Sequence, residues 1–124
     1  MVEAEKGRIG ISKEVVTAVA GIAISEVEGI ANIQSGEGVF RRGEGMRRYV
    51  DTEVEEENVK VTARIYVLYG NPIHKVAKQV QTRVKEEIER MTGLQVSGVD
   101  VEVQRLVHPD EKASQPEDEE DEQE

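Results

Sequence analysis

The segment from Tyr69 to Gly93 constrains the fold most, because it carries the start and stop signals of one long helix. Asn71 suits the N-cap and Pro72 suits the first helical position, where a missing N–H costs nothing. Gly93 suits a left-handed C-cap. We therefore predict an amphipathic helix that packs through one face and carries no chemistry. Its apolar face consists of Ile73, Val76, Ala77, Val80, Val84, Ile88 and Met91.

An earlier helix is predicted from about Lys13 to Glu28. Ser12 can cap its first turn, and Gly29 can end it. This helix also has an apolar stripe, which predicts that it packs on the same core as the longer helix. We assign to that stripe Val15, Val16, Val19, Ile22, Ala23, Val27 and Ile30.

Four segments alternate between apolar and polar residues with the period of a strand, at 8–11, 49–55, 59–68 and 99–104. The clearest is the third, which runs from Val59 to Leu68. One of its faces is apolar, with Val59, Val61, Ala63, Ile65 and Val67. The other face carries Lys60, Thr62, Arg64, Tyr66 and Leu68.

The predicted order is strand, helix, strand, strand, helix, strand. We predict an α+β two-layer sandwich in which two helices pack on one face of a four-stranded, mostly antiparallel sheet, with the ferredoxin-like arrangement as the candidate. The other face would be open and charged. Residues 1–6 are expected to be a flexible N-terminus, 7–108 the folded domain and 109–124 a disordered acidic tail.

The charge of the chain is concentrated at its C-terminal end. The net charge is −10, and the residues from Asp110 to Glu124 hold nine acids and one lysine. The rest of the chain is therefore nearly neutral. The absence of cysteine excludes a disulfide, a thiolate nucleophile and a cysteine-held metal. The longest nearly apolar run, Val15 to Ile24, falls short of the about 20 residues of a membrane span, so we expect a soluble protein. The absence of cysteine fits a cytoplasmic location.

Three blocks resemble the alkaline shock protein family of Gram-positive bacteria. GRIGISKEVVTAVAGIAISEVEGIA (7–31) resembles its opening, and YVDTEVEEENVKVTARIYVLYGNPI (49–73) resembles its central hairpin. VQTRVKEEIERMTGLQVSGVDVEVQ (80–104) is similar to its closing helix and strand. The blocks occur in the family's order. The chain departs from the family in its Arg- and Gly-rich segment 36–48 and in its long acidic tail.

The resemblance implies a non-enzymatic role in stress and cell-envelope homeostasis. Family members are small cytosolic proteins, some held at the membrane by a separate anchored partner, and self-association occurs among them. The resemblance supplies no catalytic residue, cofactor or metal ligand. We therefore expect a scaffold or adaptor that binds a protein partner, reaches the membrane only through that partner, and can form a homo-oligomer.

The candidate partner-binding residues combine arginines with apolar anchors. Arginine forks bind carboxylates or phosphates in a bidentate manner, and an exposed Tyr or Leu suits a protein contact. The acidic tail would tune such contacts. The opposing interpretation of the arginine-rich segment is a solvated loop whose charges balance nearby acids. The candidates are Phe40, Arg41, Arg42, Met46, Arg47, Arg48, Tyr66 and Leu68.

The alternative function is an RNA- or single-strand nucleic-acid-binding module whose arginines are modulated by the acidic tail. The net negative charge argues against it, and the sheet face offers few aromatic residues. Other classes find less support. The Gly-x-Gly pairs match neither the Rossmann nor the P-loop pattern. His74 and His108 do not define a metal site, and no Ser or Thr has a local His partner.

Overall fold

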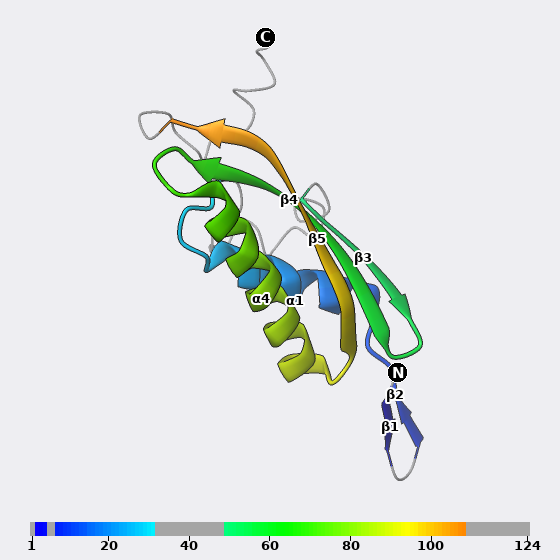
Figure 1. The fold of residues 1–124 in the computed structure, drawn as a ribbon. Helices are drawn as coiled ribbons and strands as arrows, with labels where there is room; N and C mark the ends of the chain where they lie inside the picture. Colours follow the sequence, from blue (N-terminus) through cyan, green and yellow to red (C-terminus); the bar gives the residue numbers. More distant parts are fainter. Residues whose placement is uncertain (1, 5–6, 32–48, 109–124) are drawn as a thin grey trace.

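The computed structural model describes residues 2–4, 7–31 and 49–108, which form an α+β structure (Figure 1). The helices are α1 (Lys13–Ser25) and α4 (Ile73–Thr92). The strands are β1 (Val2–Ala4), β2 (Gly7–Ile9), β3 (Val50–Glu55), β4 (Asn58–Leu68) and β5 (Gln95–Val107).

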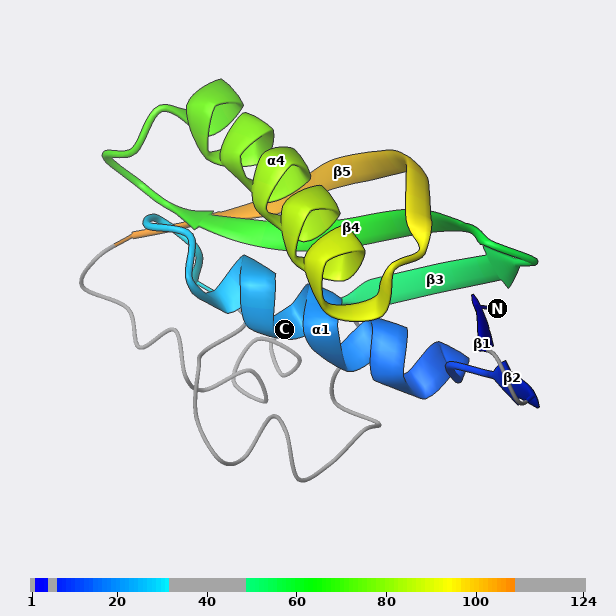
Figure 2. The ribbon, with the colours of Figure 1, turned by 90° about the horizontal axis from the view of Figure 1, so that it is seen from below.

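The main sheet has the strand order β3-β4-β5, and both helices cover the same face of it (Figure 2). β3 pairs antiparallel with β4 from Val50↔Ala63 to Glu55↔Asn58. β5 pairs with β4 in parallel over the whole length of β4. A parallel pair needs a crossover connection, and α4 supplies it. The expected mostly antiparallel sheet is therefore a mixed one.

The predicted fourth strand of the main sheet is not shown. In the described residues the segment near Arg8 forms β2, and β2 pairs antiparallel with β1 from Val2↔Ile9 to Ala4↔Gly7. This hairpin lies apart from the main sheet (Figure 1). Closing a short local hairpin costs little chain entropy, which favours this pairing over a distant one.

β4 forms the centre of the core, as its alternation predicts. Its five apolar side chains are fully buried, from Val59 to Val67. On α4, Val76, Val80, Val84 and Ile88 are buried, but Ile73 and Met91 are 41% and 58% exposed because they lie in its terminal turns. Each buried Val or Ile contributes about 1.5–3 kcal/mol relative to exposure.

The buried face of α1 differs from the predicted stripe. Ala20 and Ile24 are fully buried, whereas Val15 and Ile22 are 49% and 39% exposed. α1 is apolar on several sides, so helical periodicity alone does not select the face that meets the core. Packing against α4 and β3 selects it.

The helix ends agree with their predicted signals to within a few residues. Gly93 has a φ of 79° and donates its N–H to the carbonyl of Glu89, so the predicted left-handed C-cap is confirmed. The N-cap of α4 is Pro72, one residue after Asn71, which the sequence analysis had assigned to that position. α1 ends at Ser25, before the predicted end at Glu28.

Candidate partner-binding surface

The predicted binding residues divide into two groups. Phe40, Arg41, Arg42, Met46, Arg47 and Arg48 lie outside the described residues. Tyr66 and Leu68 lie near the end of β4, on the face of the main sheet opposite the helices, which we call the open face. Both side chains are half-buried. The sequence therefore placed these two on the correct face.

Tyr66 belongs to a cluster that the sequence did not predict. Its ring lies 6.2 Å from that of Tyr49, edge to face, and the guanidinium carbon of Arg105 lies 5.6 Å from its centroid. A β-bulge between Ile65 and Tyr66 brings Arg105 opposite Tyr66. This contact requires one extra residue in β5 between the residues paired with Ile65 and Tyr66. A strict alternation of faces along β5 does not predict such a bulge.

Ion pairs cover much of the rest of the open face. Arg64 donates to Asp51 at 3.0 Å across β3 and β4. Lys60 lies 3.4 Å from Asp100 across β4 and β5. Because the carboxylates and Lys60 are largely exposed, such pairs add little stability and mainly keep the face hydrated.

The outer edge of β5 is partly covered by α4. The backbone N–H of Val96 donates to the Glu89 carboxylate at 3.0 Å, and the Gln81 side chain donates to the carbonyl of Val99 at 3.0 Å. Hydrogen bonds from Lys85 and from the Val96 N–H lower the pKa of Glu89. Helical spacing places Gln81 and Glu89 on the surface of α4 and does not indicate that they bind the backbone of β5.

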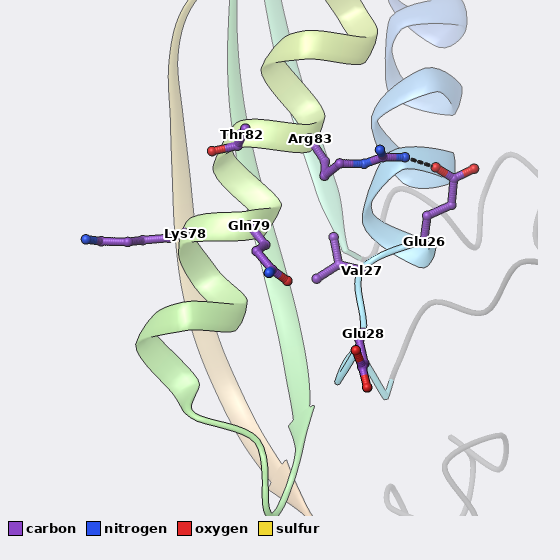
Figure 3. A pocket seen from close by; sticks show the side chains of 7 residues that line it. All are labelled: Glu26, Val27, Glu28, Lys78, Gln79, Thr82 and Arg83. Atoms are coloured by element: carbon purple, nitrogen blue, oxygen red, sulfur yellow. Dashed lines mark hydrogen bonds and ion pairs between the residues drawn. The ribbon is translucent and has the colours of Figure 1, made fainter.

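A groove lies between the C-terminal end of α1 and the middle of α4 (Figure 3). Its volume is about 400 Å³, and Val27, Gln79 and Thr82 line it together with charged residues. Arg83 on α4 points toward Glu26 and forms an ion pair with it, whereas Lys78 points away. The groove is open and suits a small side chain of a partner better than an enclosed ligand.

Two classes of site are absent from the described part of the chain. Among residues 2–4, 7–31 and 49–108, no three His, Asp or Glu side chains are grouped as metal ligands. None of the helices in these ranges is long and apolar enough to cross a membrane.

Comparison with known proteins points to one family. Residues 1–108 match the model of the ASP23 (alkaline shock protein) family, described by a cell envelope-related function. The Bacillus subtilis protein YloU is 36% identical over 111 residues, which are 83% of this chain and 92% of YloU. YqhY of the same organism is 28% identical over 105 residues, covering 78% of this chain and 75% of YqhY.

A third relative carries a name related to stress. The stress response regulator gls24 homolog of Streptococcus pyogenes is 26% identical over 108 residues, which are 83% of this chain and 60% of that protein. The family model covers the whole described domain. This chain therefore belongs to the ASP23 family, whose described function is related to the cell envelope.

Proposed function

We propose that this chain is a non-enzymatic adaptor of the stress response and cell-envelope homeostasis. It works in the cytoplasm by binding a protein partner, and it reaches the membrane only through an anchored partner. The family description and the name of the Streptococcus pyogenes relative support the biological setting. The mode of action is our inference from the surface of the domain.

The open face carries this proposal. In the described residues both helices pack on the other face of the main sheet (Figure 2). On the open face, the cluster of Tyr66, Tyr49 and Arg105 lies beside charged side chains. Tyr and Arg are enriched where protein interfaces bind most strongly, because each combines a large contact area with polar groups. The ion-paired side chains around this cluster would form the polar rim of the interface.

An affinity pull-down from lysate of the source cells, with nuclease added, tests the proposal. The bait is the intact chain, compared with the double variant Tyr66→Ser, Arg105→Ser. A matched control, His74→Ser with Lys75→Ser, changes two exposed residues of α4 that lie outside the groove. We expect an envelope protein to be recovered with the intact chain and the control but lost with the open-face variant. Equal recovery with all three baits would contradict the proposal.

The arginine-rich segment remains a prediction with its own test. Replacing Arg41, Arg42, Arg47 and Arg48 by Ser should weaken binding of the purified partner without changing the free energy of unfolding. The affinity of the intact chain should also fall as salt rises from about 50 to about 500 mM, because the Debye length shrinks several-fold. If the affinity changed neither with the four substitutions nor with the salt concentration, the electrostatic part of the proposal would be wrong.

A nucleic-acid-binding module is the second candidate, and the contact of Arg105 with the Tyr66 ring favours it. Aromatic rings and guanidinium planes stack on unpaired bases. The same face carries Asp51, Glu53 and Glu102, which repel phosphates. Binding of single-stranded RNA by the chain truncated after His108, with a steep salt dependence, would support this second function. Recovery of the partner after nuclease treatment would count against it.

A further inference from the structure

The positive charges of α4 are gathered in its first part. Residues 73–85 include no acid, whereas three glutamates follow in residues 86–89. The amino end of a helix carries a partial positive charge, so lysines near it are unfavourable for the helix itself. Helix stability therefore does not explain this order of charges. The lysines and arginines of residues 73–85 are Lys75, Lys78, Arg83 and Lys85.

Two of these side chains form no ion pair within the folded domain. Arg83 and Lys85 are each paired with a glutamate. Among residues 2–4, 7–31 and 49–108, no carboxylate forms an ion pair with Lys75 or Lys78. Both are exposed, and residues three apart are neighbours on a helix surface. Lys78 also points away from the groove and from the acids that line it (Figure 3). We call Lys75 and Lys78 the lysine pair.

The acidic tail leaves the domain beside the start of α4. The Tyr69 N–H donates to the Val107 carbonyl at 2.8 Å, and the rings of Tyr69 and His108 stack with their centroids 6.1 Å apart. The end of β5 therefore lies beside the connection that leads from β4 into α4 at Ile73 (Figure 1). Residues 109–124 accordingly begin close to the lysine pair.

The length and charge of the tail fit this surface. Its residues 109–117 span at most about 30 Å. This reaches beyond the first two turns of α4, which are about 11 Å long and contain the lysine pair. Residues 117–122 are all acidic. Because a tethered segment has an effective concentration in the millimolar range, even weak contacts populate its bound state.

We propose that the acidic tail binds the exposed side of α4, with residues 117–122 against the lysine pair. The bound tail neutralises the positive start of α4, and any other acidic segment that binds there must displace it. This surface lies on the helix-covered side of the main sheet, away from the open face. The proposal therefore does not rest on partner binding at the open face, and the two fail separately.

A single spin label locates the tail in the full chain. The chain has no cysteine, so Gln123→Cys, next to the acidic run, provides one attachment site for a nitroxide. The paramagnetic broadening of backbone amide signals is then measured by NMR. We expect the strongest broadening in residues 73–82. Raising the salt from about 50 to about 500 mM should weaken it, because surface charges are then screened.

Two variants test the residues that hold the tail. Lys75→Gln with Lys78→Gln should reduce the broadening of residues 73–82 by about twofold or more, since it removes both cations while keeping a residue of good helix propensity. The matched control is Lys13→Gln, which changes an exposed lysine of α1 and should leave the broadening unchanged. Thermal melting followed by circular dichroism confirms that both variants fold, and Lys78→Gln serves alone if the double variant is destabilised.

Several outcomes would overturn the proposal. Uniform broadening over the domain would show that the tail has no preferred contact, and unchanged broadening in the lysine variant would show that other residues hold it. Loss of broadening after replacing Arg41, Arg42, Arg47 and Arg48 by Ser, but not in the lysine variant, would assign the tail to the arginine-rich segment. Broadening of an unlabelled chain by an added labelled chain would assign it to a second copy.

Discussion

The hydroxyl groups of Thr17 and Thr52 lie 2.8 Å apart in the core and form a hydrogen bond between α1 and β3. Both side chains are buried, with exposed fractions of 9% and 1%. A buried hydroxyl without a hydrogen-bond partner destabilises the folded state, and each threonine supplies the partner that the other needs. The pair lies where the buried side of α1 packs against β3.

Replacing one threonine of this pair should cost more than replacing both. Thr17→Val leaves the Thr52 hydroxyl without its partner, and we expect a loss of about 1–3 kcal/mol in the free energy of unfolding. Thr17→Val with Thr52→Val should be close to the unaltered chain, because two apolar groups of the same shape then meet. Urea denaturation followed by circular dichroism measures both. Additive losses in the double variant would show that the hydrogen bond is not the reason for the pair.

The buried face of α1 can be tested by two neighbouring isoleucines. Ile24 is fully buried and Ile22 is 39% exposed. Ile24→Ala should lower the free energy of unfolding by about 2–5 kcal/mol, through lost burial and a residual cavity. Ile22→Ala, a matched truncation, should cost about 1 kcal/mol or less. Similar losses for both would mean that α1 meets the core through a different face.

Gly29 is required for close packing as well as for its backbone conformation. Its φ is 98°, and a Cβ there would lie 3.0 Å from Cγ2 of Val76 and 3.1 Å from Cγ of Asn71. Gly70 has a similar φ of 107°, but nothing lies within 4 Å of its Cβ position. Gly70→Ala should therefore cost only the left-handed strain of about 1–2 kcal/mol.

Gly29→Ala should cost more than Gly70→Ala, because it adds a steric clash to the same backbone strain. Chemical denaturation of the two variants under identical conditions gives the difference. If Gly29→Ala proved no worse than Gly70→Ala, then residues 29–31 would not be packed against the start of α4.

The protection of the β5 edge should respond to pH. Hydrogen bonds from Lys85 and the Val96 N–H lower the pKa of Glu89 below its usual 4.5. The folded chain therefore holds fewer protons than the unfolded chain in acid, so this stabilisation is complete above about pH 4.5 and is lost as the pH falls through the lowered pKa.

Glu89→Gln should remove this component, so its melting temperature should fall less steeply than that of the unaltered chain as the pH drops below about 4.5. Gln81→Ala removes the other edge contact without removing a titrating group, and its effect on the melting temperature should not vary with pH. Parallel melting curves for Glu89→Gln and the unaltered chain in acid would contradict the assignment. Glu87, whose pKa is lowered by Arg90, contributes in the same direction and remains in both proteins.

The local elements of this protein could be predicted from its sequence, because their signals act within a few residues. Pro72 and Gly93 mark the ends of α4, because proline fixes its own φ and lacks an N–H, whereas glycine readily adopts the left-handed conformation of a C-cap. Strict alternation predicted the buried face of β4 and, with it, the placement of Tyr66 and Leu68 on the open face. The family was also recognisable, because three ordered blocks carry its pattern.

Only the tertiary structure decided how these elements meet. The apolar surface of α1 extends around several sides. Its buried face is therefore determined by its contacts with α4 and β3, which include the hydrogen bond of Thr17 with Thr52. The pairing of β2 with β1, the parallel register of β5 and the bulge that brings Arg105 to Tyr66 depend on partners distant in the sequence or on local irregularities. The covering of the β5 edge by Gln81 and Glu89 arises in the same way. Periodicity shows which side of an element is apolar, and the free energy of the packed arrangement determines what that side contacts.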